Sequence, residues 1–97
     1  MVAYVIVDLH ITDPLAYEEY KALAPESIAA YGGRYLVRGG QCETLEGSWS
    51  PQRVVVLEFA SIEQAKAWHR AAEYQALHEM RRRFAVSNMV VVEGMGG

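Results

Sequence analysis

Four segments of the chain alternate between apolar and polar residues, which is the pattern of half-buried β-strands. The first segment places Val5, Val7 and Leu9 on one face and turns Tyr4 and Asp8 to the other. The third, QRVVVLEF, is the most apolar and is expected near the centre of a sheet. The predicted strands cover residues 3–10, 34–39, 52–59 and 88–93, with a short further strand at 42–45 inside the bulged connection 39–51.

Apolar residues three and four positions apart predict two helices between these strands. The first begins at Asp13-Pro14, a capping residue followed by a proline that suits the first turn, and ends at Gly32. Pro25 is expected to kink or divide this helix, because proline removes a backbone donor and clashes with the preceding turn. The expected buried stripe comprises Ala16, Tyr20, Leu23, Ser27, Ile28 and Tyr31.

The second helix is expected to begin after Ser61, and Gln64 three residues later completes a capping-box pattern. Its buried residues fall into two groups, and a bend is expected between them at residues 71–73. The groups are Ile62, Ala65 and Trp68, then Leu77, Met80 and Phe84. We expect Trp68 to be buried against the sheet beside Phe59 or Leu9.

The order strand, helix, strand, strand, helix, strand repeats one unit twice. With right-handed crossovers it predicts an α+β, ferredoxin-like βαββαβ sandwich, a four-stranded antiparallel sheet with two helices on one face. The other face keeps apolar side chains such as Tyr4, Ile6, Val54 and Val56. A bare apolar face of that size is a liability in a monomer. We therefore expect a homodimer in which a second copy packs on this sheet face.

Composition and charge exclude several kinds of partner. The 97 residues are 52% apolar and 22% charged, which is typical of a single globular domain, here residues 1–97. A net charge of −3 offers no basic surface to nucleic acid. The longest apolar run, residues 1–7, is too short to cross a membrane. Cys42 is the single cysteine and cannot form an intrachain disulfide, so we expect a cytoplasmic location.

Six short motifs resemble an uncharacterised bacterial family, domain of unknown function 1330. The motifs are YGGRYLVRGG (31–40), LEGSW (45–49), VVVLEF (54–59), AW (67–68), EYQ (73–75) and VVEG (91–94). The resemblance covers nearly the whole chain. It implies a dimeric α/β barrel, in which the sheets of two protomers form one barrel. Where the family often has a proline before the EY pair, this chain has Ala72, so its second helix is expected to bend less.

The superfamily implied by this resemblance includes cofactor-free monooxygenases, muconolactone-isomerase-like enzymes, haem proteins and stress-induced proteins. The resemblance therefore implies a fold and a dimer but no particular reaction.

Polar residues on the bare sheet face are the candidates for a ligand cavity. Tyr4, Asp8 and His10 share the bare face of the first strand. Glu58 is expected on that face of the third strand and Arg38 on that face of the second. An acid beside an arginine on an apolar wall can position an anionic or enolisable substrate, and a nearby histidine can shuttle a proton. The alternative is that Arg38 and a carboxylate form an ion pair that only balances charge at the dimer interface.

The remaining histidines and aromatic residues predict neither a metal site nor a cofactor. His69 and His78 are nine positions apart and would lie on opposite sides of a single helix, so they are not expected to share a metal ion. The arginines at 81–83 spread around the end of that helix, where positive charge is favourable. The tyrosines and Trp68 are expected in the core or the interface and not around a haem or flavin.

The sequence favours a small homodimeric protein of uncharacterised activity that binds a small organic molecule in its barrel cavity. Two alternatives stay open. One is a cofactor-independent monooxygenase or isomerase-like enzyme that uses Asp8, His10, Arg38 and Glu58. The other is a non-catalytic stress-response or interaction dimer whose barrel is filled by side chains. An open pocket lined by those four residues would favour the enzyme.

Overall fold

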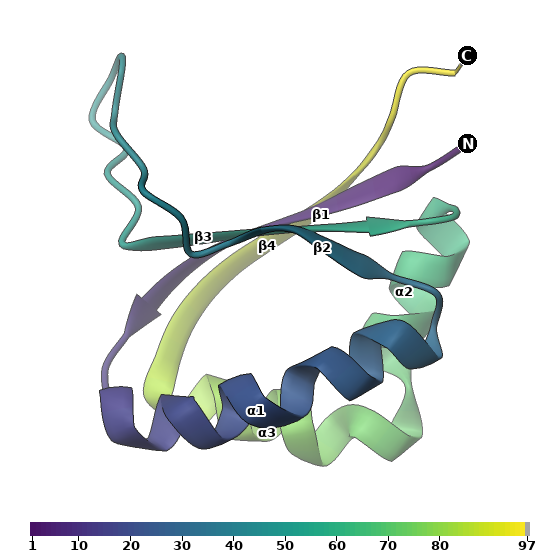
Figure 1. Cartoon of the computed structure of the whole chain (residues 1–97), viewed down its shortest axis with the longest axis horizontal. Helices are drawn as coiled ribbons and strands as arrows, with labels where there is room; N and C mark the ends of the chain where they lie inside the picture. Colours follow the sequence, from purple (N-terminus) through teal and green to yellow (C-terminus); the bar gives the residue numbers. More distant parts are fainter. Residues whose placement is uncertain (97) are drawn as a thin grey trace.

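The computed structural model describes residues 1–96 and confirms the ferredoxin-like α+β fold. Its antiparallel sheet has the strand order β2-β3-β1-β4. The strands are β1 (Ala3–Ile11), β2 (Arg34–Arg38), β3 (Arg53–Phe59) and β4 (Ala85–Glu93). The helices are α1 (Pro14–Ala30), α2 (Ile62–Arg70) and α3 (Gln75–Phe84), with the short 3₁₀ turn η1 (Ala72–Tyr74) between α2 and α3. Figure 1 shows the helices together on one side of the sheet.

The core lies between the sheet and these helices. Alternate residues of the two central strands are buried there, namely Val5, Val7 and Leu9 of β1 and Val55, Leu57 and Phe59 of β3. Trp68 of α2 is 2% exposed, and its ring centroid lies 5.5 Å from that of Phe59. Its indole Nε1 donates a hydrogen bond to Ser27 Oγ on α1 at 3.2 Å. The predicted burial of Trp68 beside Phe59 is confirmed.

Helix α1 runs through Pro25 without interruption, so the prediction that this proline divides it is wrong. A proline at position 25 leaves the carbonyl of Lys21 without its helical donor. Arg38 Nη2 donates a hydrogen bond to that oxygen, which replaces the missing one. The buried stripe also differs from the prediction, because Leu23 is 52% exposed while Ala24 is buried.

The second predicted helix is divided into α2, η1 and α3, which confirms the bend at residues 71–73. At Ala71 the backbone leaves the helical region, with φ −55° and ψ 120°. The side chain of Gln75 spans the break, because its Nε2 donates to the carbonyls of His69 at 3.2 Å and Ala71 at 3.1 Å. The expectation that Ala72, in place of a proline, makes this helix bend less than in other members of the family stays a prediction. A glutamine on α3 satisfies the carbonyls that the break exposes.

Two of the predicted strands differ from the structure. The short strand at 42–45 does not form, and residues 39–52 are a loop that adds no strand to the sheet of the described residues. Strand β4 begins at Ala85, three residues before its predicted start, because it continues its pairing with β1 as far as Ile11.

The loop 39–52 is fixed at both of its ends and projects away from the helices (Figure 1). Trp49 Nε1 donates a hydrogen bond to Asp8 Oδ2 on β1 at 2.8 Å. At the other end Gly39 has φ +71°, and a Cβ there would collide with the guanidinium of Arg53. Only glycine adopts a positive φ readily and lacks the Cβ that would collide with Arg53, which explains why a glycine follows β2.

The sheet face turned away from the helices is apolar at its centre. The register places Tyr4 between Glu58 and Val92, and Ile6 between Val56 and Val90. Val90 is 59% exposed and Val92 is 47% exposed. We call this surface the open face, and it is the bare face that the alternation of residues predicts.

Candidate functional site

Two cavities lie between the helices and the sheet, and the larger has a volume of about 160 Å³. It lies where α2 meets β1 and β4. Buried Ala65 and Trp68 line its inner part, and exposed Lys66, His69 and Arg70 line its outer part. An apolar cavity of roughly 150 Å³ is large enough for a benzene-sized molecule. We call this space the α2 cavity.

The smaller cavity has a volume of about 30 Å³ and lies between α1 and the sheet. Trp68 and Met89 line both cavities, so these two side chains stand between them. The polar groups around the smaller cavity are three tyrosine hydroxyls and four cations, and no Asp or Glu lines it. They are Tyr17, Tyr20, Tyr35, Lys21, Arg38, Arg53 and Arg81. We call this space the α1 cavity.

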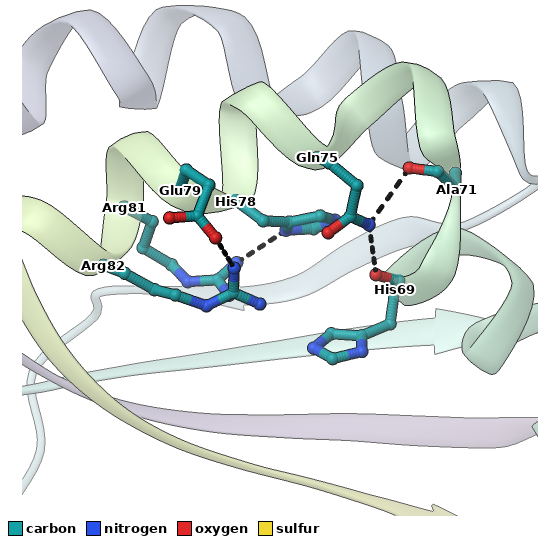
Figure 2. A network of polar contacts seen from close by, with 7 residues as sticks. All are labelled: His69, Ala71, Gln75, His78, Glu79, Arg81 and Arg82. Carbon is teal, nitrogen blue, oxygen red and sulfur yellow. Dashed lines mark hydrogen bonds and ion pairs between the residues drawn. The ribbon is translucent and has the colours of Figure 1, made fainter.

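The break between α2 and α3 brings two histidines together, although the sequence predicts them on opposite sides of one helix. The ring centroids of His69 and His78 lie 5.5 Å apart. On one continuous helix, positions nine residues apart would point to opposite sides, but the extended backbone at Ala71 ends α2 and changes the direction of the chain between the two histidines. The prediction that the two lie on opposite sides is therefore wrong. Figure 2 shows His69 projecting from the end of α2 toward the sheet, beneath His78.

His78 is fully buried and is held in one tautomer by its neighbours. Arg81 Nη1 lies 3.0 Å from His78 Nδ1 (Figure 2). A guanidinium only donates, so Nδ1 must carry the lone pair and Nε2 the proton. Nε2 lies 3.5 Å from the carbonyl oxygen of Trp68. Burial and the charge of Arg81 lower the pKa of His78 to about 4, so the ring is neutral near pH 7.

His69 has a lowered pKa as well, because of partial burial and the charges of Arg81, Arg82 and Arg70. Its ring makes no hydrogen bond to any side chain or backbone group in the part of the chain that the structure describes. A neutral imidazole with a free lone pair beside an apolar cavity can accept a proton from a bound molecule.

Arg81 is 3% exposed despite its charge. The sequence predicts it as a favourable charge at the end of a helix, but its side chain turns into the α1 cavity. Its Nη1 lies 3.5 Å from the hydroxyl of Tyr20, and its buried Nε has no hydrogen-bond partner among residues 1–96.

Four of the five predicted ligand-cavity residues lie on the open face. Tyr4, Asp8 and Glu58 are partly buried there, and His10 is exposed. The structure does not bring them into either cavity of the single chain. Their assignment to a ligand cavity stays a prediction that depends on a second copy covering this face.

Arg38 lies on the helix-facing side of the sheet, so its predicted place on the open face is wrong. A β-bulge at Leu36 shifts the register of β2 against β3. Tyr35 pairs with Leu57 and Arg38 with Val55, which are both buried beneath the helices. The bulge adds one residue, and one residue reverses every later side chain of a strand. The guanidinium of Arg38 stacks 4.6 Å from the centroid of the Tyr35 ring, at the exposed edge of the sheet.

Of the two acids on the open face, Glu58 is paired with Arg34 and not with Arg38. Arg34 Nε donates to Glu58 Oε1 at 3.0 Å, and the two residues are register partners on β2 and β3. Arg34 precedes the bulge and therefore keeps the face that the alternation predicts. The ion pair that the sequence suggests for Glu58 exists, with a different arginine.

The described residues contain no group of three or more His, Cys, Asp or Glu side chains placed to hold a metal ion. Within residues 1–96, no helix is long and apolar enough to cross a membrane.

Among the residues around the cavities, His78 and Arg81 are the ones whose burial sequence reasoning missed. On α3, the apolar stripe Leu77, Met80 and Phe84 lies beside a polar stripe of His78 and Arg81, which are three residues apart and therefore share a face. Hydrophobicity favours the first stripe, yet the second is the buried one. The signal that the sequence offered is the spacing of His78 and Arg81, which puts these two polar residues on one face of α3.

Comparison with known protein families identifies one that matches nearly the whole chain. A family described as a domain of unknown function, DUF1330, matches residues 2–95. No protein of curated function matches the sequence.

Solved structures with the same fold come from several bacteria. A protein of unknown function from Rhodopseudomonas palustris superposes with a TM-score of 0.78 at 15% identity, covering 99% of this chain and 84% of that one. SnoaB, a cofactor-independent oxygenase from Streptomyces nogalater, has a TM-score of 0.60 at 13% identity, covering 99% and 94%. A dimeric protein of unknown function with a ferredoxin-like fold from Bacteroides fragilis has a TM-score of 0.58 at 14% identity, covering 96% of each chain. At these identities the likeness shows the fold alone.

Proposed function

The chain belongs to the DUF1330 family, and we propose that it acts as a small homodimer that binds a small organic molecule in the α2 cavity. This keeps the function that the sequence favours but moves the ligand from the open face to the helix side of the sheet.

The α2 cavity is the observation that carries the proposal. Its volume of about 160 Å³ suits a small organic ring. Ligand sites are typically concave and mostly apolar, with a few polar groups that fix the orientation of the ligand. Ala65, Trp68 and Met89 supply apolar surface, and Lys66 and His69 supply the polar groups.

The open face supports the homodimer. Its centre is formed by Ile6, Val54, Val56, Val90 and Val92, and the last two are about half exposed in the single chain. A second copy of the same sheet would bury these side chains by the symmetric contact that most homodimers use. The Bacteroides fragilis protein of the same fold is described as dimeric, which supports the same arrangement here.

A cofactor-independent oxygenase or isomerase is the second candidate function, and His69 favours it. Its lowered pKa keeps the imidazole unprotonated near neutral pH, and its ring stands beside the α2 cavity. A base in this position could remove a proton from an enolisable molecule, which is the first step in both kinds of reaction. The likeness to SnoaB is consistent with this candidate.

A cytoplasmic location is part of the proposal. The only cysteine, Cys42, is exposed on the loop 39–52 and has no partner for an intrachain disulfide.

The proposal is tested by filling the α2 cavity. Ala65 of α2 is buried and lines this cavity, whereas Ala67 lies on the exposed side of the same helix. Wild-type protein and the variants Ala65→Met and Ala67→Met are purified without denaturation, unfolded, and their small molecules identified by mass spectrometry. We expect the same molecule from wild type and Ala67→Met and at most a trace from Ala65→Met. Equal yields from all three proteins, or no molecule from any of them, would contradict the proposal.

The enzymatic candidate is tested with the molecule so identified. The variant His69→Asn removes the base and keeps a polar side chain of similar size. We expect a loss of turnover of about 100-fold or more with unchanged binding if His69 is the base. If the variant turns over as fast as wild type, His69 is not the base, and only the binding function is supported.

A further inference from the structure

We propose that the α1 cavity is an anion site that binds a small carboxylate, or the carboxylate end of a longer acid, on Arg81 and Arg53. This goes beyond the proposed function, because it concerns a different cavity and holds even if the α2 cavity binds nothing.

The first observation is an imbalance of charge. Four of the chain's nine Lys and Arg residues line this cavity, and none of its twelve Asp and Glu residues does. The whole protein carries a net charge of −3, so a cavity whose only charged lining residues are cations has the opposite balance of charge to the chain as a whole. Glu18 pairs with Lys21 at 3.2 Å, which leaves the three arginines. Carboxylates of residues 1–96 do not approach Arg53 or Arg81 to ion-pairing distance.

The second observation is that both arginines have unsatisfied buried atoms. The Nε of Arg81 and the Nε of Arg53 are buried, and neither has a hydrogen-bond partner among the described residues. A buried guanidinium without an acid is costly, because the charge has left water and no opposite charge replaces the lost hydration. Buried polar atoms in native proteins nearly always have a partner.

The neighbouring tyrosines do not supply the missing negative charge. Burial raises the pKa of Tyr17 and raises that of Tyr35 to about 12, although Arg53 and Arg38 oppose these shifts. Their hydroxyls are therefore neutral. They can donate hydrogen bonds to an anion but cannot balance the arginines.

Among small anions, a carboxylate best fits the size and shape of the α1 cavity. A volume of about 30 Å³ holds about two water-sized groups, which matches the two oxygens of a carboxylate. Guanidinium groups bind carboxylates through two parallel hydrogen bonds, and the Nε–H is one of the donors suited to this geometry. The cavity reaches from buried Arg81 to Arg38 at the exposed edge of the sheet, so a longer acid has room for its remainder outside.

The test compares formate with formamide, two probes of nearly equal size that differ in charge. Saturation-transfer NMR irradiates the methyl groups of the protein and detects the C–H proton of each probe. We expect transfer to formate and not to formamide. The variant Arg81→Met removes the charge and keeps the length of the side chain, and we expect it to bind formate at least about tenfold more weakly.

The control is Arg82→Met, which removes the next charge on the same helix. Arg82 is exposed and pairs with Glu79 at 2.6 Å, so formate binding should be unchanged. If Arg81→Met does not fold, Arg53→Met carries the same test. Absence of transfer to formate, equal transfer to formamide, or formate binding unaffected by both charge removals in the cavity would overturn the proposal. Butanoate then distinguishes the source of the carboxylate, because tighter binding than formate indicates the end of a longer acid.

Discussion

At the scale of single residues, burial determines the chemistry of His78 more than its type does. An exposed histidine titrates near pH 6.5, whereas His78 is 0% exposed and faces the guanidinium of Arg81. Both effects favour the neutral ring. The sequence cannot predict this, because histidine and arginine three residues apart on a helix are usually solvated.

The first prediction concerns the pH dependence of stability. Folded His78 stays neutral down to about pH 4, while the same histidine in the unfolded chain binds a proton near 6.5. The unfolded chain therefore binds more protons between these values, and the stability that His78 contributes is complete above pH 6.5 and lost as the pH falls toward 4. The loss amounts to up to about 3 kcal/mol.

The measurement is urea unfolding of wild type and His78→Asn at pH 7.5, 5.5 and 4.5. The amide oxygen of the replacement still accepts a hydrogen bond from Arg81 but does not titrate. We expect the difference in unfolding free energy between the two proteins to shrink as the pH falls. A constant difference would show that His78 is not the titrating group.

The second prediction concerns Trp68, which packs against Phe59 and separates the two cavities. Trp68→Ala is expected to reduce the unfolding free energy by about 3–5 kcal/mol, the range for a large aromatic residue removed from a core. Trp49→Ala is the matched control, because Trp49 is 61% exposed, and its loss is expected to cost about 1 kcal/mol or less. Equal losses in thermal unfolding of the two variants would contradict the assignment of Trp68 to the core.

At the scale of secondary-structure elements, alternation was sufficient to predict the four strands and the open face, and helical spacing was sufficient to predict the helices between the strands. These patterns did not predict the positions of side chains that follow an extra residue in a strand or a break in a helix. The bulge at Leu36 moves Arg38 across the sheet, and the break at Ala71 brings His69 and His78 together. The bulge has no period that a pattern can reveal. The two groups of buried residues did predict the bend at residues 71–73, but not that it brings the two histidines together. The bulge is accompanied by a contact between distant segments, the hydrogen bond from Arg38 to the carbonyl of Lys21 on α1.

The third prediction couples the bulge of β2 to the proline of α1. Arg38 supplies the hydrogen bond that Pro25 denies to the carbonyl of Lys21. Arg38→Leu alone is expected to cost about 1 kcal/mol, the net value of one hydrogen bond. In a Pro25→Ala background the amide at position 25 bonds to Lys21 instead, so Arg38→Leu is expected to cost almost nothing. Chemical denaturation of the four proteins gives the coupling energy, and additive effects would show that the two positions are independent.

At the scale of the whole molecule, the open face is the surface whose apolar side chains a single chain leaves uncovered. Its predicted apolar centre is present, and two copies joined there would enclose Tyr4, Asp8, His10 and Glu58 between their sheets. Their role as ligand-cavity residues therefore depends on that assembly.

The fourth prediction tests the assembly at the centre of the open face. Val56→Lys places a charge beside Ile6, and a buried unpaired charge opposes association. Leu15→Lys adds the same charge on α1, where Leu15 is 85% exposed on the helix side. Light scattering is expected to give about twice 10.8 kDa for wild type and Leu15→Lys, and the monomer mass for Val56→Lys. A dimer that tolerates Val56→Lys would place the interface elsewhere.

Native mass spectrometry of the wild-type protein tests the central claim, a dimer that binds a small organic molecule, most directly. We predict a species whose mass is twice 10.8 kDa plus one or two copies of a small molecule, and the extra mass should disappear when the protein is unfolded in acid. A monomer at micromolar concentration, or a dimer whose mass equals that of two bare chains, would contradict the account.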